Sequence, residues 1–197
     1  MPDMGEAAVR IPKERRQRDA TKAESRSAIL DAARRVATRD GARDLSLRGV
    51  AAEAGFAPAA LYGYFRNKDE LLLALAADDL TSLARAMRGA GGLAGAGAAA
   101  LALLSGAETM AAASAALPGA GGGDAERLFN GRLIAALRAL SDASGLPSDS
   151  RQSQCDVVLV AAALAGLALL ARSGRLEALG FTPDEMIARL DGRFRSA

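Results

Sequence analysis

The segment LYGYFRNKDELL, residues 61–72, decides the fold because an aromatic cluster stands directly before a helix start. Aromatic residues make up only 4% of the 197-residue chain, yet Tyr62, Tyr64 and Phe65 lie together here. Asn67 is a good helix N-cap, and Glu70 follows it at the spacing of a capping box. The segment therefore predicts the end of one short helix and the beginning of another.

The residues before this segment predict two further helices. Apolar side chains recur at helical spacing over residues 29–37, which predicts a helix from Ser25 that ends at Gly41. Ser46 is a suitable N-cap for a second helix. Gly55 suits a tight turn at the end of that helix, because glycine adopts positive φ without strain.

A third, very short helix is predicted from Pro58, because proline is favoured at the first helical position. Further helices are predicted at about 68–88, 98–116, 125–144, 150–173 and from Pro183 onward, with the Ala/Gly-rich residues 89–97 as a break. No segment alternates apolar and polar residues over the length of a strand. The chain is therefore predicted to be all-α, with about nine helices.

The composition argues against catalysis. The chain has no histidine, which removes the commonest metal ligand and the usual general base. Its single cysteine, Cys155, is expected to be a buried thiol in a reducing compartment. We predict no cofactor and no metal site. A helical enzyme acting on a small molecule is a weak alternative, because no nucleophile–base pair is evident.

The most apolar run, residues 157–171, is uncharged but 15 residues long. A membrane-spanning helix needs about 20 such residues. We therefore expect a buried helix at this position, no membrane partner and a cytoplasmic protein.

Charge is concentrated near the N-terminus. Residues 10–26, RIPKERRQRDATKAESR, hold seven basic and three acidic residues, a net charge of +4, against +2 for the whole chain. Residues 1–24 show no apolar periodicity and are predicted to be a flexible arm. The arm either contacts a polyanion or is a solvated tail, and the sequence leaves both open.

Two short helices joined by a glycine-containing turn, behind a supporting first helix, predict a helix-turn-helix. Such a unit places its second helix in the major groove of DNA. Tyr62 and Tyr64 carry hydroxyl groups on short, stiff side chains, and Lys68 lies in the first turn of a helix. All three suit phosphate oxygens, which fix the register of a protein on DNA without reading its sequence.

Residues 25–75 resemble the N-terminal domain of the TetR (tetracycline-repressor-like) family of bacterial transcription regulators. The residues that carry the resemblance are AILDAARRVATRDGARDLSLRGVAAEAGFAPAALYGYFRNKDELL, residues 28–72. Matching positions are Gly41, Ser46, Ala54, Gly55, Leu61, Tyr62, Tyr64, Phe65, Lys68 and Glu70. Ala57 and Ala60 depart from the family pattern, which usually has polar residues there; a cap and a hydroxyl contact to phosphate are thereby lost.

The resemblance implies a basic arm at 1–24, a DNA-binding domain at 25–72 and a helical effector-binding and dimerisation domain at 73–197. It implies double-stranded operator DNA, a second copy of the chain and a small-molecule effector as partners. Arg48 lies where the family faces DNA, and it is expected to contact a base or a phosphate. The residues expected to face DNA are Ser46, Arg48, Pro58, Ala59, Ala60, Tyr62, Gly63, Tyr64 and Lys68.

Two apolar groups are predicted in the C-terminal domain. The expected effector pocket is lined by Leu103, Leu104, Met110, Phe129, Leu133 and Leu137. The expected dimer interface comprises Ala161, Ala162, Leu164, Ala165, Leu169, Met186, Ile187, Leu190 and Phe194. The function so predicted is a repressor that binds a palindromic operator as a dimer and is released by a largely apolar effector. The alternative is a constitutive DNA-binding regulator whose C-terminal half only dimerises.

Overall fold

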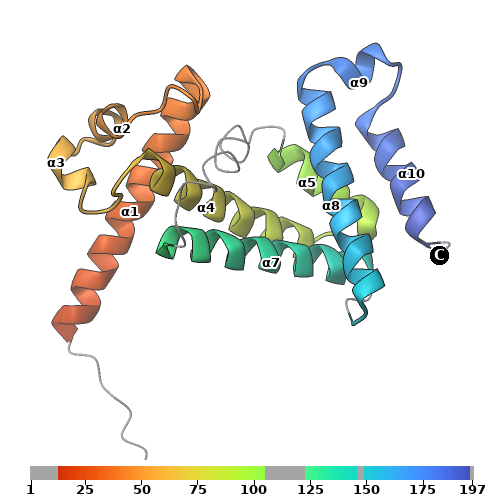
Figure 1. The fold of residues 1–197 in the computed structure, drawn as a ribbon, viewed down its shortest axis with the longest axis horizontal. Helices are drawn as coiled ribbons and strands as arrows, with labels where there is room; N and C mark the ends of the chain where they lie inside the picture. Colours follow the sequence, from red (N-terminus) through yellow and green to blue (C-terminus); the bar gives the residue numbers. More distant parts are fainter. Residues whose placement is uncertain (1–12, 105–122, 146–148, 196–197) are drawn as a thin grey trace, which may run out of the picture.

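The computed structural model describes residues 13–104, 123–145 and 149–195, and in these ranges it contains nine helices and no strand. Three helices form the N-terminal domain (Figure 1): α1 (Lys13–Asp40), α2 (Leu47–Ala54) and α3 (Pro58–Leu61). The C-terminal domain comprises α4 (Lys68–Arg88), α5 (Gly92–Leu104), α7 (Asp124–Ser144), α8 (Arg151–Arg172), α9 (Arg175–Ala178) and α10 (Pro183–Arg195). The all-α prediction is confirmed.

Two predicted boundaries were wrong. Residues 13–24, expected to be an arm without regular structure, extend α1 by three turns. Their Lys, Arg, Glu, Gln and Ala residues favour helix, and the apolar periodicity is missing because no other described element covers them. Helix α5 begins at Gly92 rather than near residue 98, so that most of the predicted Ala/Gly-rich break is helical.

The N-terminal domain is held by one small apolar core. Ile29 of α1, Val50 of α2 and Leu61 of α3 are completely buried, and Phe65 is almost so. Phe65 comes from the loop between α3 and α4, so its ring brings that loop against the other helices. The short α3, which is too short to be stable by itself, is thereby fixed in place.

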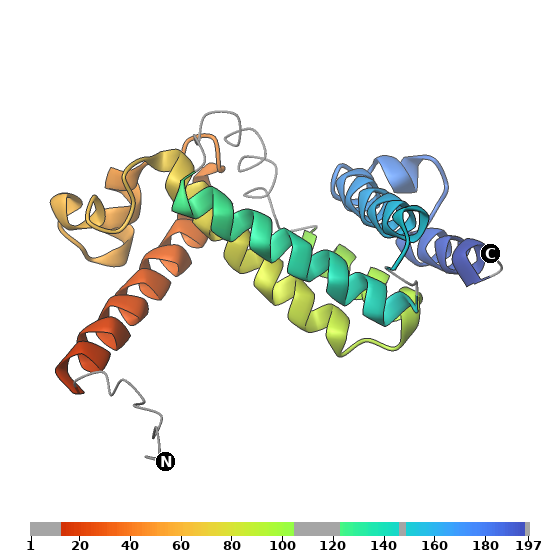
Figure 2. The ribbon, with the colours of Figure 1, turned by 60° about the horizontal axis from the view of Figure 1, so that its bottom comes forward.

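Helix α4 connects the two domains (Figure 2). Its residues 71–77 are all buried, because α1 packs against it near its start and α5 and α7 pack along its length. Arg34 of α1 adds polar contacts to this packing: its guanidinium bonds the carboxylates of Asp78 and Asp79, the latter at 2.9 Å. The N-terminal domain and the C-terminal domain are therefore coupled through one helix.

Helix α5 packs closely because it lacks side chains where other helices cross it. A Cβ atom at Gly97 would lie 3.0 Å from Ile187 Cγ2 of α10 and 3.3 Å from Leu164 Cδ2 of α8. Leu164 and Ile187 are both buried within the protomer. Their prediction as dimer-interface residues is therefore wrong: the two side chains fill the space beside Gly97.

Helix α8 was expected to be buried, but only one of its faces is. Val157, Val160, Leu164 and Leu167 point into the protomer at helical spacing. Cys155 is exposed, contrary to expectation, because it lies off this stripe. The opposite stripe carries Val158, Leu159, Ala162, Ala165, Gly166 and Leu169, all exposed. By length and composition α8 passes the test for a membrane-spanning helix, as apolar helices of soluble proteins also do.

Two glycine-to-alanine substitutions separate helix propensity from crowding. Gly131 of α7 has open space around an added Cβ, whereas Gly97 does not. Gly131→Ala should raise the free energy of unfolding by roughly 0.5–1 kcal/mol. Gly97→Ala gains the same helix propensity but overpacks the contact of α5 with α8 and α10. Its free energy of unfolding should therefore be roughly 1–3 kcal/mol below that of Gly131→Ala. Urea unfolding of both variants measures the difference, and equal stabilities would contradict the close α5–α10 contact.

Candidate nucleic-acid interface

The turn between α2 and α3 is set by local hydrogen bonds. The Ser46 hydroxyl oxygen accepts from the Gly49 amide at 3.1 Å, which caps α2. Gly55 ends α2 at φ 72°, and the Phe56 amide bonds the Ala51 carbonyl at 2.9 Å. A left-handed residue at this place lets the chain reverse within a few residues, so that α3 lies beside α2.

Helix α3 presents an exposed face of small residues. Pro58 stands at its start, and Ala57 before it gives no side-chain cap, as the departure from the family pattern implies. Pro58, Ala59, Ala60 and Gly63 are all exposed. This face allows close approach of the backbone to a ligand surface and offers apolar contacts rather than hydrogen bonds.

The hydrogen-bonding groups of this surface lie around α3. Tyr62 is 56% exposed, a high value for an aromatic side chain. Arg48 on α2 is also exposed, and its guanidinium has no ion pair or hydrogen bond with any described residue. Both side chains are therefore available to an external partner.

Tyr64 is half-buried and rigid. Its ring meets the ring of Phe56 edge-to-face, with the centroids 6.3 Å apart and the planes at 78°. Edge-to-face pairs of this kind are a favoured aromatic geometry. The hydroxyl group is thus carried on a ring whose orientation is fixed by the helix-turn-helix itself.

Lys68, predicted to bind phosphate, has a partner inside the protein. Its ammonium donates a hydrogen bond to the carbonyl oxygen of Arg43, in the turn between α1 and α2. The start of α4 is capped as predicted by Asn67, whose Oδ1 accepts from the Glu70 amide at 2.8 Å. Glu70 reaches back to the Arg66 amide at 2.7 Å rather than to that of Asn67. Lys68 therefore ties α4 to the α1–α2 turn, a role that sequence reasoning missed.

Two further positioning contacts were not foreseen. Glu53 of α2 accepts from Arg35 Nε at 2.7 Å and from Arg39 at 3.1 Å, and these hydrogen bonds hold the pKa of its carboxyl below the ordinary value. The guanidinium of Arg26 lies 5.2 Å above the centre of the Phe65 ring. From sequence alone, charged residues on a helix are expected to face solvent. These contacts became visible only in the packing of α1 on its neighbours.

Only some of the residues predicted to line the effector pocket line a cavity in the structure. Leu104, Leu133 and Leu137 line an apolar cavity of about 160 Å³, together with Leu80, Leu83 and Met87 of α4 and residues of α5, α7 and α8. Phe129 is buried but is not one of the lining residues. Leu103 is exposed, contrary to prediction, because it lies on the outer side of α5. Met110 lies outside the described residues.

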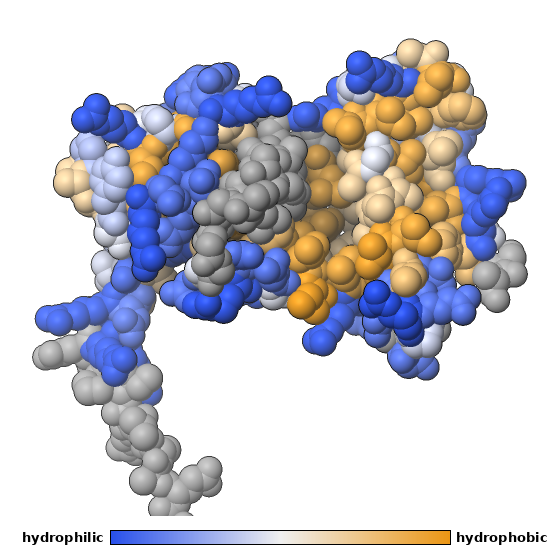
Figure 3. All heavy atoms as spheres, viewed as in Figure 1, coloured by the Kyte–Doolittle hydropathy of each residue, from blue (hydrophilic) through white to orange (hydrophobic). Residues whose placement is uncertain are grey.

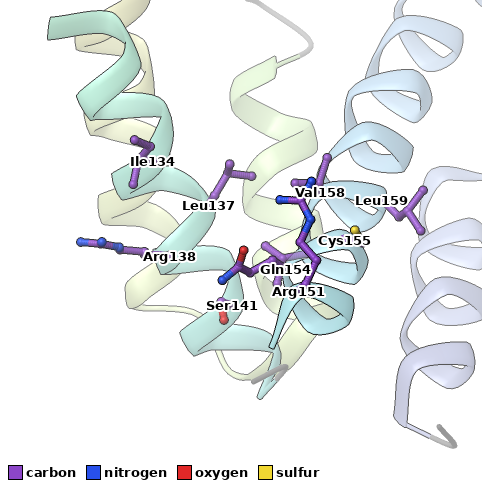
Figure 4. A pocket seen from close by; sticks show the side chains of 10 residues that line it. Ile134, Leu137, Arg138, Ser141, Arg151, Gln154, Cys155, Val158 and Leu159 are labelled. Carbon is purple, nitrogen blue, oxygen red and sulfur yellow. The ribbon is translucent and has the colours of Figure 1, made fainter. Parts of the chain in front are cut away.

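A wider groove of about 670 Å³ adjoins this cavity between α7 and α8 (Figure 4). Ile134, Val158 and Leu159 give it apolar walls, and Arg151 and Gln154 project into it from the start of α8. Leu137 lines both the groove and the cavity.

An exposed helix-turn-helix joined through one helix to a larger helical domain defines a class of bacterial regulatory protein. Residues 29–75 match the model of the tetR family of bacterial regulatory proteins. This match covers about a quarter of the chain and confirms the resemblance of its N-terminal domain to that family. It is a family of regulators, in agreement with the prediction that the chain is not an enzyme.

The chain is similar to a curated relative and to solved structures. It is 47% identical over 62 residues to the HTH-type nicotine-responsive transcriptional repressor HdnoR of Paenarthrobacter nicotinovorans, a match that covers 32% of each chain. A TetR transcriptional regulator from Rhodococcus sp. RHA1 superposes with a TM-score of 0.64 at 19% identity, over 87% of this chain and 96% of that one. The fatty acid degradation regulator FadR from Bacillus halodurans gives 0.57 at 15% identity, over 85% and 93%. These structures share the fold.

Arg48 is expected to read a base rather than only a phosphate. Arg48→Ala should reduce the preference for one base pair per half-site by roughly 1–3 kcal/mol, the discrimination of a bidentate arginine–guanine pair. Arg48→Lys keeps the charge but loses the planar fork, and should lose the same preference while holding its affinity for random DNA. Titrations of both variants on a selected operator and on random DNA measure this. Equal losses on the two DNAs would reduce Arg48 to a phosphate clamp.

Proposed function

We propose that the chain is a DNA-binding transcriptional repressor that binds a near-palindromic operator as a homodimer and is released by a small, largely apolar effector. The observation that carries the proposal is the exposed face of α2 and α3, on which Arg48 and Tyr62 are free to contact DNA. An α-helix fits the width of the major groove. The site of action is DNA, so the proposed location is the cytoplasm.

Few side chains on this face can read bases by hydrogen bonds. Ala59, Ala60 and Pro58 suit contact with thymine methyl groups, and Gly63 allows the backbone to approach. Tyr62 and Tyr64 are proposed to hold phosphates and so to set the register of α3. Ser46, whose hydroxyl caps α2, is proposed to meet a phosphate at the start of that helix, which favours an anion.

The dimer is proposed to form through the exposed stripe of α8. Leu169 is 60% exposed on this stripe, whereas Val158 and Leu159 at the start of α8 line the groove between α7 and α8. Figure 3 shows hydrophobic residues gathered over this side of the molecule, whereas the helix-turn-helix side is largely hydrophilic. Ala162 and Ala165 have small side chains, which allow two helices to approach closely along the stripe. Four other residues expected in the interface are partly buried against the core of the chain: Ala161, Met186, Leu190 and Phe194.

The experiment that tests the function is selection of duplexes by the full chain from a random DNA library. We expect an enriched near-palindrome, with half-site centres separated by about one helical turn of 10–10.5 base pairs or a multiple of it. Enrichment of a single asymmetric half-site would contradict the dimeric mode, and no enrichment over random DNA would contradict the function.

Leu169→Glu supplies the matching test of the interface, because it places a charge on the exposed stripe of α8. Leu128→Glu, also at an exposed leucine but on α7, is the control. We expect sedimentation at micromolar concentration to show a dimer for the unmodified chain and the control, and a monomer for Leu169→Glu. A monomer for all three would show that α8 does not serve as the interface.

The effector is proposed to occupy the cavity and the adjoining groove. Three residues of α4, Leu80, Leu83 and Met87, line the cavity, and the same helix begins at the DNA-binding domain. A ligand releases DNA only if it prefers a conformation in which the two DNA-binding domains are misplaced. Because α4 belongs to both domains, displacement of its cavity-facing residues moves its N-terminal end.

Filling the cavity tests this assignment. Ala136→Leu adds three carbon atoms at a lining position, whereas Ala135→Leu adds them at a neighbouring position outside the lining. With the amphiphilic dye 1-anilinonaphthalene-8-sulfonate as the probe, we expect Ala136→Leu to bind the dye more weakly and to resist dye-induced release from DNA. The Ala135→Leu protein should behave as the unmodified chain. If bound apolar ligands leave DNA affinity unchanged, the constitutive regulator is the correct function.

A further inference from the structure

The N-terminal extension of α1 carries a basic stripe. Arg15, Arg18, Lys22 and Arg26 follow one another at intervals of three and four residues, so they share one face of the helix. The same spacing continues through Ile29, Ala33 and Val36, which are buried against the helix-turn-helix. The face of α1 that packs on the domain in its second half is therefore the face that carries cations in its first half.

The C-terminal end of the stripe, at Arg26, packs on the rest of the DNA-binding domain. Arg26 lies over the ring of Phe65, and Arg18 and Lys22 line an open notch of about 550 Å³ with Gln17, Thr21 and Tyr64. Tyr64 is one of the residues expected to hold a phosphate. The cations of the stripe and this tyrosine thus border the same space.

The charges of the stripe are not neutralised inside the protein. Arg15, Arg18 and Lys22 are exposed, and none forms an ion pair with another described residue. Figures 1 and 2 show this part of α1 projecting past the helix-turn-helix, with no other helix alongside it. Asp19 also lies on this face, four residues after Arg15, so the face of residues 15–26 carries four cations and one anion. Its net positive charge would be compensated by a polyanion lying against it.

We infer that the first three turns of α1 are a second DNA contact, in which Arg15, Arg18 and Lys22 bind backbone phosphates beyond the half-site read by α2 and α3. This inference rests on the proposed DNA-binding function. From Arg15 to Lys22 the helix rises about 10 Å. At 3.4 Å per base pair along one strand, the stripe adds contacts over about three base pairs.

The occupant is nucleic acid rather than a lipid surface. A helix that lies on a membrane buries a face of large apolar residues, and residues 13–28 contain none. The stripe also borders Tyr64 at the edge of the helix-turn-helix. The phosphates it meets are therefore those next to the half-site.

The experiment compares two arginines on opposite faces of the same helix. Arg18 lies in the stripe, and Arg16 points about 160° away from Arg18 at 100° per residue. Alanine favours helix at least as well as arginine, so Arg18→Ala and Arg16→Ala both leave the extension helical. The two variants carry the same charge. Each is titrated, as the full chain, on the selected operator with long flanks and on a version trimmed to the half-sites, over a salt series.

Arg18→Ala is expected to lose about five- to tenfold in affinity per protomer on the flanked operator, and its salt slope should fall by about 0.9 per protomer. On the trimmed operator its affinity should equal that of the unmodified chain, and Arg16→Ala should lose little on either. Equal losses for both variants would overturn the inference in favour of general attraction. No loss for either, with the operator still bound, would overturn it too. Failure of the unmodified chain to bind any operator would contradict the proposed function itself.

Discussion

Burial of helix α4 is the constraint on which the rest of this structure depends. Its residues 71–77 are all inaccessible to solvent, although a helix on a protein surface buries only one stripe. Such a segment is stable only when other helices cover it on all sides, and here α1, α5 and α7 do so. The two domains are therefore not independent units joined by a linker. A displacement of α4 in one domain therefore also changes its position in the other.

The two ends of α4 carry different contacts. At the N-terminal end, Lys68 bonds the Arg43 carbonyl, and further along Asp78 and Asp79 bond Arg34 of α1. Toward the C-terminal end, Leu80, Leu83 and Met87 border an apolar cavity. The helix is about 30 Å long, and its hydrogen bonds make it stiff. In the proposed function, a ligand in the cavity acts on the DNA-binding domain through this stiff helix.

The surface proposed to face DNA offers few hydrogen-bonding side chains. Alanine, proline and glycine dominate the outer face of α3, and Arg48 and Tyr62 stand beside them. A surface of this kind recognises shape and methyl groups more than donor–acceptor patterns. Its affinity then depends more on phosphate contacts, and the basic stripe of α1 supplies a set of cations outside the helix-turn-helix.

Much of the fold was contained in local sequence. Capping residues such as Ser46 and Asn67, the proline at the start of α3 and the inward Leu61 and Phe65 act over a few residues, so a pattern discloses them. Tyr62 and Tyr64 were expected to face DNA from a local pattern of this kind, and Arg48 from the family resemblance. What depends on several helices at once was not predictable: the partner of Lys68, the Arg26–Phe65 contact, and the burial of Leu164 and Ile187 beside Gly97.

The sequence by itself determined that the chain is helical, where its helix-turn-helix lies and which family it resembles, because these depend on periodicity, caps and short motifs. Only the tertiary structure decided which face of α8 is exposed, that residues 13–24 continue α1, and which apolar residues line a cavity rather than a core. An apolar side chain gives the same sequence pattern whether it lines a cavity or packs in a core. Whether it meets another helix or an open space depends on how distant segments cross, and no local pattern contains that information.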